Sequence, residues 1–495
     1  MERRRPLDDA EAAREVEGHV EELGDPEASP ANPSGTLALG ATPEAVASFE
    51  PVDSTGEIWR LAWPLMLSMT LASVVGIADI AMVGRLGATA QAAVGYAAQL
   101  FFLAQSALFA LSFACVALMA RAIGGGRPVE ARRALAASLI VALVASLVLL
   151  LGIAAHPAPL LARLSASPEV IALCVPYLRL LMASTVLLSV CLTLESAFRA
   201  DRDTKTPMRI TLGVTATKLA LNVLLIFGAP ALGIPAFGVA GAGYATLLAQ
   251  CVALALFVTV TRRKPADAAT TLRLRDFQGL SPYFRPLVRI ALPGVGERIV
   301  MNLAMMTYFA FIGTYGTAAA AAYTIGIRIL SFTWIPGTGY SQAVATLVAQ
   351  ALGAGDVARA ERSGWRAARL AITTAVAMGA VGALVREPLA ALFTVDRETV
   401  AALGPFMLCL SLAQPAMQLH FTLAGVFRGA GDTVTPLYAS FVGNWLFRVP
   451  LAFLAANVWH LDLIWIWLTL ILDHIARAAW LLWSFARGRW RRQLY

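Results

Sequence analysis

The sequence predicts an all-α membrane protein whose twelve transmembrane helices form two pseudo-symmetric six-helix bundles. First, 58% of the 495 residues are hydrophobic and only 14% are charged, which is too little charge for the surfaces of a soluble chain of this length. Second, apolar stretches of about 20 residues, the length that crosses a bilayer, recur along most of the chain. Third, the second half of the sequence repeats the first.

The apolar stretches set the expected domain organisation. We predict spans at 58–83, 93–119, 134–155, 170–198, 210–228, 239–260, 290–312, 319–349, 367–385, 400–427, 437–456 and 463–486. These spans divide the chain into a disordered N-terminal tail (1–55), an N-lobe (56–260), a linker (261–289), a C-lobe (290–487) and a basic C-terminal tail (488–495).

Charge predicts the orientation. Residues 1–55 carry 13 acidic and 4 basic residues and contain no apolar run typical of a signal peptide. Arginine and lysine concentrate in alternate loops, which favours a cytoplasmic side for those loops. Both termini, and the linker, are therefore expected in the cytoplasm. The basic loops are 121–133, 202–209, 262–289 and 359–366.

A shift of 229 residues superimposes the two halves without a gap. FRADRDTKTP (198–207) falls on FRGAGDTVTP (427–436). Each half holds an even number of spans, so the halves share one orientation and are related by a pseudo-two-fold axis along the membrane normal. Such a duplication favours a transporter with alternating access over a channel. Other matched pairs are Pro64 with Pro293, Gly84 with Gly313, and Gly124 with Gly353.

The repeated motifs resemble those of the multidrug and toxic compound extrusion (MATE) family. They are IADIAMVGRLGATAQAAVGYA after the first span, the paired loops ARAIGGGRPVEARRA and AQALGAGDVARAERS, and FRGAGDTVTPL. The resemblance covers about residues 57–490. It implies a monomeric multi-pass antiporter of the bacterial inner membrane, which exports small organic, often cationic, solutes in exchange for protons or sodium.

Charges inside spans are functional candidates because they are costly in a bilayer. Asp79 has no ionisable partner one helical turn away, and neither has Lys218. At about 1.5 Å rise per residue, both lie with Asn222 and Thr246 in one layer, about 8–15 Å below the outer helix ends. The resemblance implies that Asp79 is the cation-responsive site, which Asn, Asp and Thr complete at positions 218, 222 and 246.

This sequence departs from that pattern at two positions, since Lys218 replaces Asn and Asn222 replaces Asp. An ammonium group opposes a sodium ion, so we expect proton coupling in preference to sodium. The hypothesis is that Asp79 and Lys218 form a buried ion pair and that protonation of Asp79 breaks it. The alternative is that Lys218 only replaces a structural ion or water.

The C-lobe holds the reserve candidates. Glu297 is adjacent to Arg298, and the resemblance implies an acidic residue in this helix. Arg328 and Arg448 lack acidic residues within a turn, and we expect them to bind carbonyl groups at helix interruptions or to recognise an anion in the cleft. Two further expectations concern structure alone. Asp473 should pair with Arg477, and Asp203 and Asp432 should cap the helices that follow them.

Three competing functions remain. A flippase for lipid-linked saccharides, from the same wider superfamily, would suit a pyrophosphate bound by Lys218, Arg328 and Arg448. An enzyme is disfavoured because no HxxxH, HExxH or GxSxG motif occurs. A channel would need a selectivity filter, which the sequence lacks. We expect no cofactor, no metal site among the five cysteines, and no nucleic-acid partner.

Overall fold

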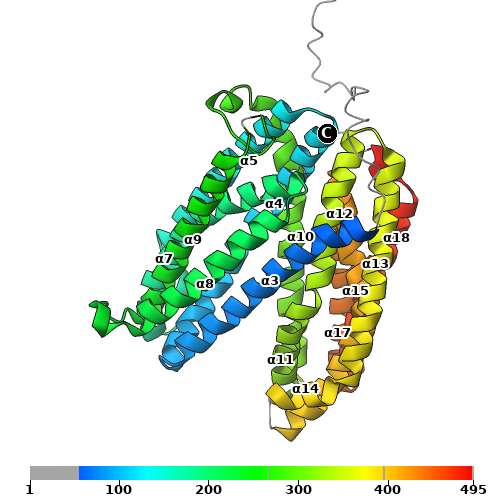
Figure 1. Cartoon of the computed structure of the whole chain (residues 1–495). Helices are drawn as coiled ribbons and strands as arrows, with labels where there is room; N and C mark the ends of the chain where they lie inside the picture. Colours follow the sequence, from blue (N-terminus) through cyan, green and yellow to red (C-terminus); the bar gives the residue numbers. More distant parts are fainter. Residues whose placement is uncertain (1–54, 266, 394–395, 493–495) are drawn as a thin grey trace, which may run out of the picture. The chain divides into compact units, whose positions relative to one another are not determined.

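The helices of the chain follow the predicted spans closely. The structure is a computed structural model that describes residues 55–265, 267–393 and 396–492. These residues belong to one compact unit, and twelve of their helical segments are long and apolar enough to cross a membrane (Figure 1). The tail expected over residues 1–55 lies, except for its last residue, outside the described residues.

Six spans make up the N-lobe. The first span, α3, contains Pro64 within the helix. The short helix α6 joins the third span to the fourth. The helices are α3 (Thr55–Gly84), α4 (Ala88–Gly124), α5 (Pro128–Ala154), α6 (Pro157–Arg163), α7 (Pro168–Ala200), α8 (Lys205–Phe227), η1 (Pro230–Leu232) and α9 (Gly238–Arg263).

The C-lobe repeats this order after a short linker. α10 begins at Ser281, inside the segment predicted to be linker, and carries Pro286 within its first turns. The elements are η2 (Leu274–Phe277), α10 (Ser281–Gly313), α11 (Thr317–Thr333), α12 (Ile335–Gly353), α13 (Val357–Leu384), α14 (Arg386–Phe393), α15 (Arg397–Ala430), α16 (Val434–Phe441), η3 (Val442–Arg448), α17 (Val449–Phe453), η4 (Leu454–Val458), α18 (Leu463–Ala486) and η5 (Arg489–Arg492).

The 229-residue shift also relates the helix bounds of the two halves. It carries α5, α6 and α7 onto α13, α14 and α15 to within one residue at each end. Two spans of the C-lobe depart from their copies. The eighth span breaks into α11 and α12 at Trp334, beside Pro336, and the eleventh contains the π-helical segments η3 and η4 around Pro450. Proline explains both irregularities, because it removes a helix hydrogen bond.

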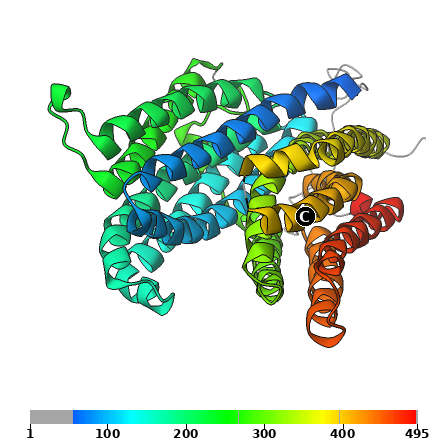
Figure 2. The same ribbon diagram turned by 90° about the horizontal axis from the view of Figure 1, so that it is seen from below.

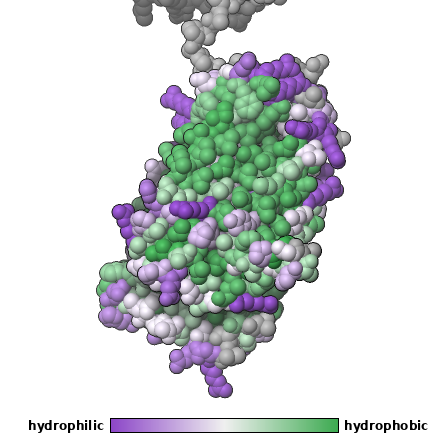
Figure 3. Space-filling view, turned by 90° about the vertical axis from the view of Figure 1, so that its left-hand side faces the viewer, coloured by the Kyte–Doolittle hydropathy of each residue, from purple (hydrophilic) through white to green (hydrophobic). Residues whose placement is uncertain are grey.

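Each lobe packs mainly on itself. α7 contacts α4, α5 and α9 in the N-lobe, whereas α15 contacts α12, α13 and α18 in the C-lobe. The colours of Figure 2 separate the two sets, with blue to green helices in one group and yellow to red helices in the other. On the face shown in Figure 3, hydrophobic side chains form a broad continuous area over the upper half, whereas the lower half is mixed and most hydrophilic side chains lie at the edges. That pattern suits a bilayer.

The lobes meet where the glycine-containing loops 124–127 and 353–356 lie, which we call the glycine-loop end. A Cβ atom on Gly124 of α4 would lie 2.0 Å from the carbonyl oxygen of Gln350 in α12. Reciprocally, a Cβ atom on Gly353 would lie 2.0 Å from the carbonyl oxygen of Arg121. Only glycine allows these two backbones to approach so closely.

Hydrogen bonds across the lobes reinforce this contact. Gln350 donates to the carbonyl oxygen of Ala200 at 2.7 Å and accepts from Arg202, which also binds Glu57 at 2.9 Å. Arg202 has a left-handed backbone, with φ of 60°, at the position where the repeat has Gly431, with φ of 85°. A non-glycine residue rarely adopts this conformation, so the lobe contact and the pairing with Glu57 hold a strained loop in place.

Candidate functional site

The structure brings Asp79, Lys218 and Asn222 together in the N-lobe. Lys218 and Asn222 stand four residues apart on α8, so both face α3. The Lys218 Nζ donates to Asp79 Oδ2 at 2.6 Å, and the Asn222 amide donates to Asp79 Oδ1 at 2.5 Å. The predicted contact between the lone carboxylate and the lone ammonium is therefore present. We call these three residues the Asp79 triad.

The triad is only partly shielded. The side chains of Asp79 and Lys218 are 20% and 19% exposed, whereas Asn222 is fully buried. The pair is thus less buried than the sequence suggested. The Asn222 Oδ1 is buried without a hydrogen-bond partner, which leaves one acceptor atom available beside the carboxylate.

Thr246 does not join the hydrogen bonds of the triad. Its hydroxyl donates to the carbonyl oxygen of Ala242 within α9, at 2.9 Å. Sequence reasoning missed Tyr177 of α7, which is buried and lies within electrostatic range of Asp79. No local signal marks Tyr177, because a tyrosine in an apolar span usually packs like any other aromatic residue.

The C-lobe has no copy of the triad. The 229-residue shift places Tyr308 opposite Asp79, Phe447 opposite Lys218 and Leu451 opposite Asn222. Tyr308 is fully buried, and its hydroxyl donates to a backbone carbonyl of α18 at 2.8 Å. The C-lobe therefore has no carboxylate–ammonium pair at the matched positions, although the buried Arg448 lies 5.4 Å from the Tyr308 ring.

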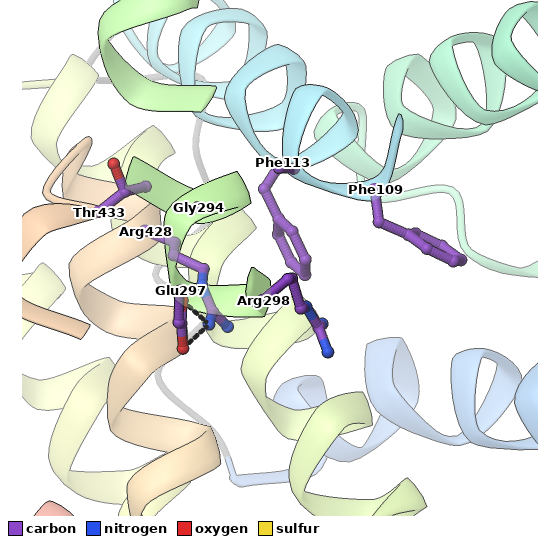
Figure 4. A pocket seen from close by; sticks show the side chains of 8 residues that line it. Phe109, Phe113, Gly294, Glu297, Arg298, Arg428 and Thr433 are labelled. Atoms are coloured by element: carbon purple, nitrogen blue, oxygen red, sulfur yellow. Dashed lines mark hydrogen bonds and ion pairs between the residues drawn. The ribbon is translucent and has the colours of Figure 1, made fainter. Parts of the chain in front are cut away.

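Glu297 lies in a small pocket between the lobes, lined by α4, α10 and α15. Its partner is Arg428 of α15, whose guanidinium reaches both carboxylate oxygens at 3.0 and 2.8 Å (Figure 4). Ser440 donates a third hydrogen bond at 3.2 Å. Arg298 and Phe113 line the same pocket, and the Arg428 guanidinium lies 5.1 Å from the Phe113 ring centre. The carboxylate is thus neutralised by Arg428, from a helix that is distant in the sequence.

The expectation for Arg448 is wrong. Its guanidinium binds Asp473 of α18 at 2.7 Å, and it is not left to carbonyl groups or to an anion in the cleft. Asp473 also pairs with Arg477 at 2.6 Å, as predicted, and Arg477 donates to Asn444 at 2.7 Å. Asp473 is fully buried, so one carboxylate serves two arginines inside the lobe.

Three residues predicted from the sequence remain: Arg328, which has no carboxylate partner in the described part of the chain, and the helix-capping residues Asp203 and Asp432. Arg328 is exposed on α11, and among the described residues it forms no ion pair. Asp203 accepts from the Thr206 amide at 3.0 Å, and Asp432 accepts from the Thr435 amide at 2.9 Å. The predicted capping roles are confirmed. No group of three or more His, Cys, Asp or Glu side chains suited to a metal occurs among the described residues.

Comparison with known proteins identifies the family. The family model MatE matches residues 64–224 and, a second time, residues 293–454, which together make up more than half of the chain. The chain belongs to the MatE family. The two matches begin 229 residues apart, as the internal repeat requires, so each lobe of this MATE transporter is one copy of the family's unit.

The relatives are transporters or are named as multidrug resistance proteins. A probable multidrug resistance protein NorM of Thermotoga maritima is 27% identical, with 88% of this chain and 93% of the relative aligned. A probable NorM of Rhodopseudomonas palustris is 28% identical, covering 92% and 96%.

Solved structures share the fold. A MOP superfamily transporter from Pyrococcus furiosus has a TM-score of 0.81 at 23% identity, covering 89% of this chain and 97% of that one. The Vibrio cholerae MATE transporter VcmN also reaches 0.81, at 20% identity, covering 89% and 98%. The predicted fold class is confirmed.

Proposed function

We propose that this MATE transporter is a secondary active antiporter that exports small organic solutes by alternating access, driven by proton entry at the Asp79 triad. The observation that carries the proposal is the 2.6 Å contact between Asp79 and Lys218. Protonation would neutralise Asp79 and remove its attraction for the ammonium group. Since the pair joins α3 to α8, the bound proton would change how these helices are held together.

The composition of the triad favours a proton over sodium. A sodium site needs several oxygen ligands and net negative charge, as hard cations generally do. Here an ammonium group binds one oxygen of Asp79 and the amide of Asn222 binds the other. The Asn222 Oδ1 is the one oxygen of the triad with no hydrogen bond, and the ammonium group opposes a second cation beside it. Thr246 directs its hydroxyl elsewhere.

Ion pairing also weighs against a lipid-linked saccharide flippase. A pyrophosphate site built from Lys218, Arg328 and Arg448 would need all three cations free for phosphate. Lys218 binds Asp79 and Arg448 binds Asp473, which leaves Arg328.

We place the glycine-loop end and both termini in the cytoplasm, in a bacterial inner membrane. Support comes from the arginine-rich loops at that end. The contact through Gly124 and Gly353 then closes the cytoplasmic side in this conformation. The function requires no second copy of the chain, because both lobes of the repeat are present in one polypeptide.

The test is transport by the full-length protein in liposomes under separately imposed proton and sodium gradients. A cationic fluorescent dye should move against a proton gradient and stay unmoved by sodium alone. Asp79→Asn should lower proton-driven export at least about tenfold, the equivalent of about 1.4 kcal/mol. Lys218→Met should weaken the dependence on the proton gradient while dye binding persists.

Asp462→Asn provides the matched control. Asp462 is an exposed carboxylate just before α18, so its loss should leave transport unchanged. Full proton coupling in Asp79→Asn would refute the proposal. Export driven equally well by sodium would refute the choice of ion.

A further inference from the structure

A second cavity lies far from the triad, where the C-terminal turn η5 folds against α18 and the loop between α15 and α16. It has a volume of about 260 Å³. Trp490 of η5 is fully buried, stacks on Phe485 at 5.2 Å and donates to the Phe485 carbonyl oxygen. Arg491 binds Glu361 of α13 at 2.7 Å. These contacts hold η5 in place, so η5 forms one wall of the cavity. We call it the tail pocket.

The tail pocket is positively charged. Arg487 and Arg489 line it, and both are exposed and unpaired with a carboxylate among the described residues. The Arg487 guanidinium lies 3.8 Å from the centre of the Trp483 ring. Asp432 is the acidic residue in the lining, and its oxygens already accept hydrogen bonds from Thr435 and from the backbone that follows. With two guanidinium groups and one carboxylate, the lining keeps a net positive charge.

The rest of the lining combines hydrogen-bond donors with aromatic surface. The Trp480 indole Nε1 is buried without a partner, and Ser484 lies one turn further along α18. Trp483 and Tyr438, from α18 and α16, are each about half exposed. Aromatic residues at the ends of spans typically lie at the level of lipid headgroups. A small soluble anion would use the arginines but would gain nothing from this aromatic rim.

We propose that the tail pocket binds an anionic phospholipid, with its phosphate at Arg487 and Arg489 and its glycerol and first methylenes against Trp483 and Tyr438. Basic pockets between helices at the membrane surface are suited to such headgroups. The unpaired Trp480 Nε1 supplies a further donor.

The experiment is native mass spectrometry of the full-length protein titrated with phosphatidylglycerol or with phosphatidylcholine of the same acyl chains. The wild type should retain phosphatidylglycerol preferentially. Replacing Arg487 and Arg489 together by glutamine should weaken retention about 25-fold, taking about five-fold for each arginine near the surface. Arg491→Gln is the control in the same tail, because Arg491 is occupied by Glu361 and its loss should change retention little.

Trp480→Phe provides a second test in case the double arginine variant does not fold. It removes the single N–H donor and keeps the aromatic shape, so retention should fall while thermal unfolding without lipid stays that of the wild type. Equal retention of the two lipids would overturn the proposal. So would an equal loss in Arg491→Gln, which would indicate general attraction to a basic tail. Displacement of the lipid by equimolar inorganic phosphate would identify a site for soluble anions instead.

Discussion

Replacing Gly124 with alanine should force the two lobes apart at the glycine-loop end. The new Cβ atom would lie 2.0 Å from the Gln350 carbonyl oxygen and 2.6 Å from its Cα. Real Cβ contacts essentially never fall below 3.0 Å. Both opposing atoms belong to the backbone of α12, so no side-chain rotation relieves the clash, and α4 and α12 must separate by about 1 Å.

The clash sets the size of the effect. Overpacking of this kind costs about 1–3 kcal/mol, and it acts only in the conformation in which the lobes touch. At about 1.4 kcal/mol for each factor of ten, the equilibrium should move away from that conformation by roughly 5- to 150-fold. The same clash reappears at Gly353, where a Cβ atom would meet the Arg121 carbonyl oxygen, so Gly353→Ala should have the same effect.

Distances between spin labels measure this shift. Val129 of α5 and Ala358 of α13 are exposed, repeat-related positions at the glycine-loop end, and labels there report the gap once the exposed Cys251 is replaced. Gly124→Ala should add a population of longer distances. Gly152→Ala is the control, because a Cβ atom on Gly152 would meet nothing within 4 Å. Identical distance distributions in the two variants would refute the reasoning.

Two predictions concern stability. Asp473→Asn leaves Arg448 and Arg477 without their shared carboxylate in the buried interior, so it should destabilise the protein by about 3–5 kcal/mol, measured by thermal unfolding in detergent. Asp396→Ala removes the cap of α15, whose hydrogen bonds from Thr399 hold the pKa of the Asp396 carboxyl below its usual value. A lowered pKa stabilises the fold above the unfolded-state pKa, so the small loss in Asp396→Ala should vanish as the pH falls through the folded-state value.

Matched controls exist for both. Glu387→Gln removes an ion pair with Arg386 in which the glutamate is 78% exposed, and it should cost at most about 1 kcal/mol. Ser167 caps α7 at the position related to Asp396 by the repeat, and its hydroxyl does not titrate, so Ser167→Ala should lose stability equally at neutral and acid pH. An Asp473→Asn variant as stable as Glu387→Gln would contradict the first prediction. A pH-independent loss in Asp396→Ala would contradict the second.

The sequence could predict the helices because membrane spanning imposes both length and composition. It could also predict the contact between Asp79 and Lys218, since each lacked a partner within its own helix and both belonged to one lobe. Its estimate of burial was less accurate, because exposure depends on how α3 and α8 tilt against their neighbours. The sequence alone does not encode that tilt in any short pattern.

Pairs between distant helices could not be predicted in the same way. Asp473 already had a partner one turn away in Arg477, so nothing indicated that it would also neutralise Arg448. Glu297 and Arg428 are separated by 131 positions, and each stands near other polar residues. A single sequence shows which charges can pair within a helical turn. Which of the other charges meet depends on how distant helices pack.

The Asp79 triad occurs in one half of the repeat, and this asymmetry has a consequence for the transport cycle. Where one half carries Asp79, Lys218 and Asn222, its twin carries Tyr308, Phe447 and Leu451. The charge nearest Tyr308, Arg448, is already paired with Asp473. Under the proposed coupling, an arriving proton alters the electrostatics of one twin alone. The proposal thus assigns proton sensing to one of two similar halves and a structural role to the other.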